Sequence, residues 1–170
     1  MYIKLIGAGL ILAGCGGCGM RIAMQHRKEV TALHQLVQAL DGMLCELEYR
    51  LTPLPELCRL GGEYASGGVQ GFFFTLADTM DAQLSPDVRQ CTAMSLKQVK
   101  GLPPLTAGEL ETLGQTLGRF DLQGQINVLR QCKQSCMNKL KVLEHQQTQR
   151  LRSYQTLGFC AGLALAILLF

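Results

Sequence analysis

The sequence predicts an all-α protein, an antiparallel helical bundle of about six helices whose first and last helices are continuous with membrane segments. Three observations support this fold class. Apolar residues recur at steps of three and four along two long segments, from about 30 to 51 and from about 126 to 154. Glycines, prolines and capping residues divide the region between them into short helical stretches. No stretch shows the period of two that strands require.

Composition places the chain among membrane proteins with one domain. It has 170 residues, 48% of them hydrophobic, and the apolar residues are concentrated at the two ends. The formal net charge of +3 is too small to indicate nucleic-acid binding. We therefore expect a transmembrane segment at 1–24, a cytoplasmic helical bundle at 25–153 and a second transmembrane segment at 154–170.

Each apolar run is short for a membrane span. As a helix, the uncharged run 5–20 covers roughly 24 Å of a ~30 Å hydrocarbon core, and extension to Met24 with a snorkelling Arg21 closes the gap. The final run, 157–170, reaches roughly 25 Å when Tyr154 serves as an interfacial anchor. A buried core helix is the alternative for this second run, but the run has no polar face.

Basic residues flank both runs on the side of the bundle. Arg21, Arg27 and Lys28 follow the first run, and Arg150 and Arg152 precede the second. Positive residues stay on the cytoplasmic side, so we expect a cytoplasmic bundle with both termini across the membrane. An odd number of cysteines in the bundle also favours a reducing compartment over a disulfide framework.

The N-terminal cysteines allow two other interpretations. Cys15 and Cys18 have the spacing of a redox dithiol, although the strand-to-helix context of such a site is absent. Residues 12–15 resemble a bacterial lipoprotein signal, in which Cys15 is lipidated after cleavage. The apolar run continues past Cys15, which argues against cleavage there. A membrane-anchored lipoprotein, or a generic membrane-tethered helical interaction protein, remains the alternative function.

The first long helix carries an apolar seam that should face the core. It continues from the first membrane segment and stops before Pro53. Leu36 and Met43 widen the seam into a core face. The seam comprises Val30, Leu33, Val37, Leu40, Leu44, Leu47 and Leu51.

Three short helices are expected next. Thr52 is the predicted N-cap of the second helix, with Pro53 in its first turn and the dipeptide Gly61-Gly62 at its end. A third helix should cover about 69–82 and a fourth about 86–100.

The last two helices begin at recognisable capping residues. Thr106 and Glu109 have the spacing of a capping box for a fifth helix that ends near Gly118. Asp121 is the predicted N-cap of the last helix, which should enter the membrane without a break. The apolar face of that helix comprises Ile126, Leu129, Cys132, Cys136, Leu140, Leu143, Leu151 and Tyr154.

No residue pattern indicates an enzyme, a cofactor site or a metal site. The histidines are scattered, and the sequence has no phosphate-binding loop or nucleophile elbow. Cys132 and Cys136 are neighbours on one helix face and could bind metal. No second pair at ligand spacing accompanies them, so we expect both to fill the core.

Small residues repeat every four positions in both apolar runs. Such faces let membrane helices approach closely, and packing rather than the hydrophobic effect then drives association. The alternative is that glycine is simply common in membrane helices. The two ladders are Gly9, Ala13 and Gly17 in the first run, and Gly158, Gly162 and Ala166 in the second.

Three ordered motifs resemble one protein family. Residues 46–54, ELEYRLTPL, are similar to the E-I-x-Y-x-x-T-P-L segment of stage III sporulation protein AB, with Leu47 where the family usually has isoleucine. Residues 113–125 resemble its L-G-x-x-L-G-x-x-D-x-x-x-Q segment. The tail at 157–163 resembles its L-G-x-x-x-G-L ending.

The resemblance implies a role that composition does not indicate. The family belongs to the channel complex between mother cell and forespore, and it resembles the cytoplasmic domain of inner-membrane platform proteins of type II secretion. The implied function is a non-enzymatic platform component that engages a secretion-type ATPase, stage III sporulation protein AA. Other membrane subunits and the lipid bilayer are further implied partners. The implied location is the outer forespore membrane, with the bundle facing the mother-cell cytoplasm.

Overall fold

Helices account for nearly all of the regular structure. The computed structural model describes the backbone of residues 2–83, 85 and 87–169, and the side chains of residues 24–145 except 84 and 86. Within this part the chain forms helices and no strand, which confirms the all-α fold class. The helices are α1 (Tyr2–Tyr49), α2 (Leu54–Glu63), α3 (Gly67–Asp81), α4 (Val88–Gln98), α5 (Pro104–Thr116) and α6 (Leu122–Leu169).

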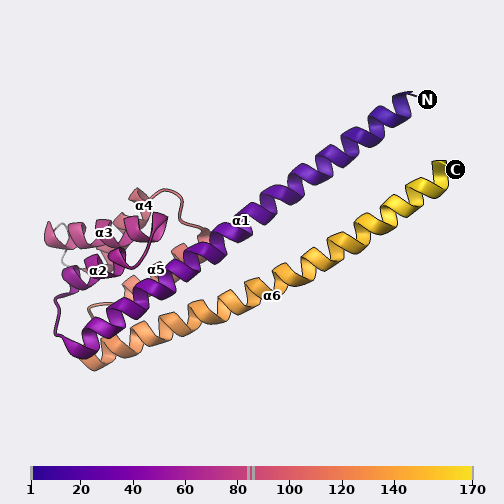
Figure 1. Cartoon of the computed structure of the whole chain (residues 1–170). Coiled ribbons are helices and arrows are strands. Elements are labelled where there is room, and N and C mark those ends of the chain that lie inside the picture. Colours follow the sequence, from indigo (N-terminus) through magenta and orange to yellow (C-terminus); the bar gives the residue numbers. More distant parts are fainter. Residues whose placement is uncertain (1, 84, 86, 170) are drawn as a thin grey trace.

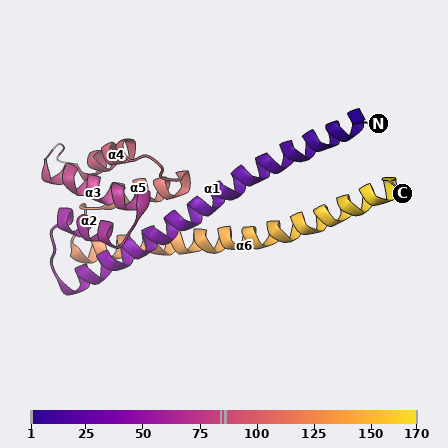
Figure 2. The ribbon, with the colours of Figure 1, turned by 45° about the horizontal axis from the view of Figure 1, so that its top comes forward.

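Two long antiparallel helices carry the four short ones. α1 and α6 lie side by side, and α2 to α5 pack together against one end of this pair (Figure 1). Both termini lie at the other end of the long helices, and a second view shows the same arrangement (Figure 2). We call the end where α1 stops and α6 starts the distal end.

The seam predicted for α1 forms much of the core. Leu33, Leu36, Leu40 and Met43 are completely buried beneath the short helices. Val30 and Val37 are half-buried, whereas Leu51 is 81% exposed. Its assignment to the seam was wrong because α1 ends at Tyr49, so the helical period no longer applies two residues later.

The other core residues come from the short helices and α6. Phe72 and Phe73 of α3 are buried, and their rings meet edge to face with centroids 5.4 Å apart. The predicted face of α6 is buried at Ile126, Leu129, Cys136, Leu140 and Leu143, whereas Cys132 is half-buried. Leu151 and Tyr154 lie outside the residues whose side chains are described.

The predicted membrane segments fall largely outside those residues. Across 24–145, with gaps at 84 and 86, no helical stretch combines the length and apolar character needed to cross a bilayer. The segments 1–24, apart from Met24, and 154–170 lie beyond this range, as do both ladders of small residues.

The start of α2 differs from the sequence prediction. Pro53 occupies the N-cap position, which the prediction gave to Thr52, and it offers no side-chain hydrogen bond. The Thr52 hydroxyl instead donates to the Glu46 carboxylate at 2.8 Å. Thr52 therefore ties the α1–α2 loop back onto α1, and Pro55 is the proline of the first turn of α2.

The capping box predicted for α5 does not form. The helix begins at Pro104, so Thr106 lies inside its first turn and Glu109 inside the helix. Glu29 of α1 accepts from one backbone donor and one side chain of that turn: Leu105 N–H donates to Oε1 at 3.1 Å, and the Thr106 hydroxyl approaches Oε2 at 3.4 Å. A distant glutamate thus replaces the local one. Asp121 precedes α6, where its carboxylate accepts from Gly124 N–H at 3.1 Å.

Removing the Glu29 carboxylate should destabilise the bundle. Glu29 is 5% exposed, and Glu29→Ala leaves the part-buried Leu105 N–H and the buried Thr106 hydroxyl without their acceptor. We expect a loss of about 1–3 kcal/mol in the free energy of unfolding, measured by urea denaturation followed by circular dichroism. Glu56→Ala, at an exposed position of α2, is the matched control. Equal stability of the two variants would contradict the capping role of Glu29.

Candidate functional site

Polar side-chain contacts join α1 to α6 along their exposed sides. Arg130 Nη2 lies 2.6 Å from Glu48 Oε1, and Lys133 pairs with Asp41. His34 Nε2 lies 3.4 Å from Glu144 Oε1, with both side chains about half exposed. Exposed pairs of this kind contribute about 0–1 kcal/mol each, so they define the register of the two helices more than their stability.

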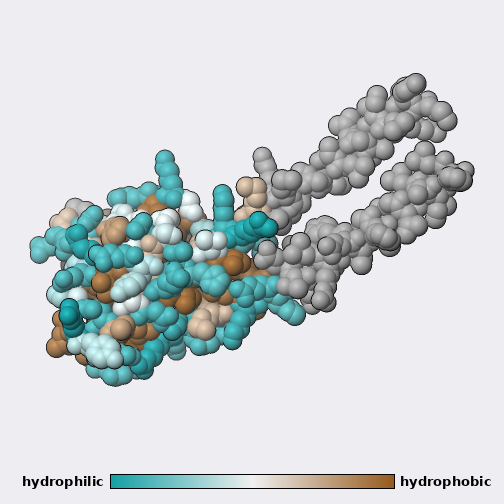
Figure 3. Space-filling view, viewed as in Figure 1, coloured by the Kyte–Doolittle hydropathy of each residue, from teal (hydrophilic) through white to brown (hydrophobic). Residues whose placement is uncertain are grey.

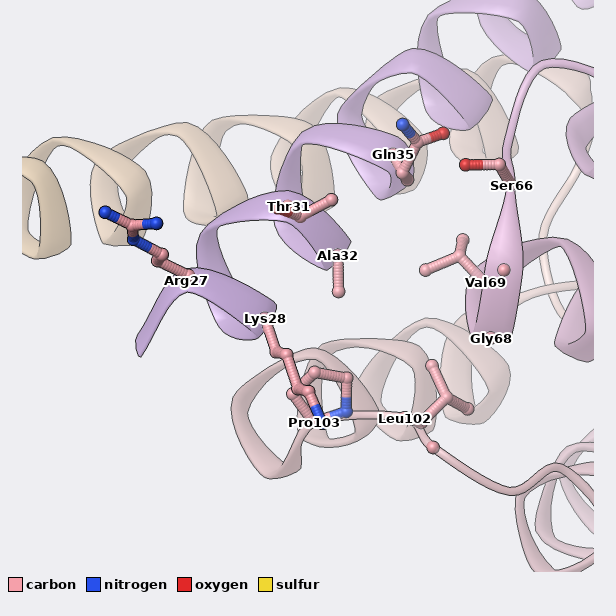
Figure 4. Close-up of a pocket in the computed structure, with 12 residues that line it drawn as sticks. Arg27, Lys28, Thr31, Ala32, Gln35, Ser66, Gly68, Val69, Leu102 and Pro103 are labelled. Atoms are coloured by element: carbon pink, nitrogen blue, oxygen red, sulfur yellow. The ribbon is translucent and has the colours of Figure 1, made fainter. Parts of the chain in front are cut away.

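A hollow of about 390 Å³ lies near the beginning of the described part of α1. It is bounded by α1, the start of α3 and the loop between α4 and α5 (Figure 4). Ala32, Val69 and Leu102 form an apolar floor, while Lys28 extends beside Pro103. The lining contains cations but no carboxylate, so it does not present the paired acid and base of a hydrolytic site.

Two glycines shape the walls of this hollow. Gly67 (φ +64°) and Gly101 (φ +89°) occupy the left-handed region, which other residues rarely adopt. A Cβ at Gly68 would come within 3.5 Å of the backbone of Gly101, so the first turn of α3 passes close to the loop between α4 and α5. These two backbone segments therefore bound the hollow on the side away from α1.

Apolar side chains are exposed at the distal end. Tyr49, the last residue of α1, is 83% exposed and Leu51, just beyond it, is 81% exposed, while Phe120 is 52% exposed shortly before α6. Leu122 in the first turn of α6 is 39% exposed. We call these four residues the distal tip. In the space-filling view, hydrophobic side chains reach the surface at the end of the domain away from the termini (Figure 3). The sequence prediction missed the tip because it assigned Leu51 to the core.

A buried cluster joins α5 to α6. Glu109, 6% exposed, accepts hydrogen bonds on Oε1 from the Ser135 hydroxyl at 2.9 Å and from the Lys139 ammonium. Its Oε2 faces the Cys132 thiol at 3.9 Å. Glu109, Cys132 and Cys136 are a possible metal-ligand group, with one ligand atom from each lying within 4.8 Å of the others. The sequence prediction recognised the two cysteines but placed Glu109 at a helix start.

The thiols of the domain differ in their surroundings. A hydrogen bond with Cys136, followed by burial, raises the pKa of Cys132. Burial alone raises the pKa of Cys58 to about 12. Cys45, by contrast, is exposed on α1. Cys58 and Cys132 therefore hold their protons at neutral pH, and Cys58 is also closed to solvent, whereas Cys45 is accessible to reagents.

These features define a class of small all-helical bundle proteins, in which two long antiparallel helices support four short ones. The sequence matches the family model for stage III sporulation protein AB over residues 4–170, and the chain belongs to this family. The resemblance inferred from the three motifs is thus confirmed.

Two relatives support the assignment. Stage III sporulation protein AB of Bacillus subtilis (strain 168) is 27% identical over 170 residues, which cover 98% of this chain and 99% of the relative. A solved structure of a stage III sporulation protein AB has a TM-score of 0.61 at 22% identity, covering 72% of this chain and 98% of the solved one. The structural likeness supports the helical-bundle fold, and the family indicates a sporulation protein.

Proposed function

We propose that the chain is a non-enzymatic platform component of the channel complex between mother cell and forespore. Its apolar ends hold it in a membrane, expected to be the outer forespore membrane, and its bundle engages an ATPase of the stage III sporulation protein AA type. The observation that carries this proposal is the arrangement of the molecule. The two termini lie at one end of the long helices, and the distal tip lies at the other.

Membrane attachment rests on the sequence of the two ends. The run 5–20 and the run 157–170 carry no charged residue, and basic residues border each on the side of the bundle. Because α1 and α6 reach both ends of the chain, the two runs would enter the bilayer from the same face. The ladders at Gly9, Ala13 and Gly17, and at Gly158, Gly162 and Ala166, would let these helices pack closely or contact other membrane subunits.

Partner binding at the distal tip follows from its exposure and its distance from the membrane. Aromatic and large aliphatic side chains dominate binding energy when they enter pockets of a partner. The described part of α1, residues 24–49, places the tip roughly 38 Å from the level of Met24. A cytoplasmic ATPase can therefore reach the tip without contacting the bilayer.

Co-purification tests the proposed partner. Full-length chain isolated in mild detergent from sporulating cells should retain the ATPase. The variant Tyr49→Ala/Leu51→Ala, isolated in the same way from cells that express it, should not. Retention of the ATPase by a chain with an altered tip would place the contact elsewhere. Absence of the ATPase from every preparation of the unaltered chain would contradict the proposed function itself.

A cysteine-labelling experiment tests the orientation. Cys45 is exposed in the bundle, whereas Cys91 is buried and serves as an internal control. A membrane-impermeant thiol reagent should fail to label Cys45 in intact cells and should label it once the membrane is opened. Labelling of Cys45 in intact cells would place the bundle outside the cytoplasm. A mature chain that begins at Cys15, detected by mass spectrometry, would support the lipoprotein alternative instead.

A further inference from the structure

The cluster of Glu109, Cys132 and Cys136 has the donor chemistry of a metal site. Two thiols come from successive turns of α6, and a carboxylate reaches them from α5. Thiolate and carboxylate donors in a group of three, with a fourth position left for solvent, suit zinc. We propose that this cluster binds one zinc ion, which joins α5 to α6.

The carboxylate is already oriented for such a role. Ser135 and Lys139 both donate to Oε1 of Glu109, and this leaves Oε2 directed toward Cys132. Hydrogen bonds that hold one oxygen of a ligand while the other faces the metal are the usual outer-shell arrangement of protein metal sites. Ligand atoms around a tetrahedral zinc ion lie roughly 3.5–4 Å apart, so the 4.8 Å group needs a shift of about 1 Å or less.

The charges of the cluster are balanced with and without the ion. Without it, two neutral thiols accompany the ion pair between Glu109 and Lys139. Binding of Zn²⁺ displaces one proton from each thiol, and these two protons leave to solvent. The two thiolates and the carboxylate are then balanced by the zinc ion and the Lys139 ammonium. A buried cluster therefore exchanges two protons for one divalent ion at constant net charge, which limits the electrostatic penalty of burial.

Solvent has access to one side of the cluster. A hollow of about 380 Å³ is lined by Glu109, Cys132 and Ser135, together with Thr112 and Gln131. It provides a route for the ion and room for a water molecule in the fourth position. Cys136 lies on the opposite, fully buried side, so a bound ion would be sheltered on that side by the core.

Cobalt provides a direct probe of thiolate ligation. Full-length chain carrying Cys15→Ser/Cys18→Ser, which removes the other closely spaced pair, is reduced, freed of metal in detergent and titrated with Co²⁺. We expect one ion per chain with a thiolate-to-cobalt absorption band, which zinc then abolishes by displacing the cobalt. Two protons should be released per ion, and affinity should fall as the pH is lowered because the thiols must deprotonate.

Variants assign the ligands. Cys132→Ser and Cys136→Ser should each remove the band, and Glu109→Gln should weaken binding by tenfold or more, since even outer-shell changes cost about 10–100-fold. Cys45→Ser, at an exposed cysteine, and Cys91→Ser, at a buried one, are the matched controls and should bind as the parent does. No band in the parent, or an unchanged band in Cys132→Ser/Cys136→Ser, would overturn the proposal.

Protection from alkylation tests the site in the unaltered chain, so the result does not depend on whether a variant folds. Cys132 is half-buried and lines a hollow open to solvent, so prolonged treatment with an alkylating reagent modifies it slowly, whereas a metal-bound thiolate is protected. Zinc should slow alkylation of Cys132 at least about tenfold and leave Cys45 unaffected, as measured by mass spectrometry of the digested chain. Equal slowing at Cys45, or no change at Cys132, would show that zinc does not bind at this cluster.

Discussion

Loss of ATPase binding and of spore formation is the expected result of Tyr49→Ala/Leu51→Ala. Both side chains are more than four-fifths exposed, so their removal costs little stability. At the centre of an interface, truncation of such anchors costs about 2 kcal/mol or more each, which weakens binding by roughly 30-fold per residue. The measurement is co-purification of the ATPase from sporulating cells, together with the yield of heat-resistant spores.

A control at the other end of the domain makes this result specific. Val142 on α6 is 56% exposed and lies far along the helix from the tip. Val142→Ala should leave both co-purification and spore yield unchanged. Normal spores from the tip variant would show that the exposed apolar side chains do not bind a required partner. Equal defects in both variants would indicate a general loss of the protein.

Gly114→Ala should destabilise the bundle by about 1–3 kcal/mol. A Cβ at this buried position of α5 would overlap the side chain of Thr92 on α4. Thr92 cannot turn away easily because it is β-branched and its hydroxyl donates to the Val88 carbonyl at 2.9 Å. The two helices must therefore separate. The measurement is thermal unfolding, in which each kcal/mol corresponds to about 2–4 °C.

The same helix offers the opposite result. Gly108 is exposed in the interior of α5, and a Cβ there meets no atom within 4 Å. Gly108→Ala should stabilise the chain by up to about 1 kcal/mol, because alanine favours the helix more than glycine does. The two substitutions are chemically identical, so opposite signs would isolate the contact between α4 and α5. A stabilising Gly114→Ala would contradict the close approach of these helices.

The two long helices and their buried faces could be predicted from the sequence because they depend on local helix geometry. Residues three and four apart must share a helix face, and so Leu33, Leu40 and Leu129 are buried as expected. The prediction failed for Leu51, where the period was extended past the end of α1. The spacing of apolar residues does not show at which residue a helix ends.

Interactions between distant residues account for the rest. The spacing of Thr106 and Glu109 fits a capping box, but two carboxylates compete for the region, and Glu29 approaches the start of α5 from 76 residues away. Glu109 is then available to Cys132 and Ser135 on α6. A sequence shows which donors and acceptors exist, whereas the packing of α5 between the long helices decides which of them meet.

The two buried glutamates connect α5 to both long helices. Glu29, at the near end of the described part of α1, holds the first turn of α5, while Glu109 in α5 holds Ser135 and Lys139 of α6. A tilt of α1 against α6 would have to break one of these contacts and leave a buried carboxylate without its partners, which is costly. A load applied to α5 would therefore reach both long helices together, so that α1 and α6 would move as one rigid body.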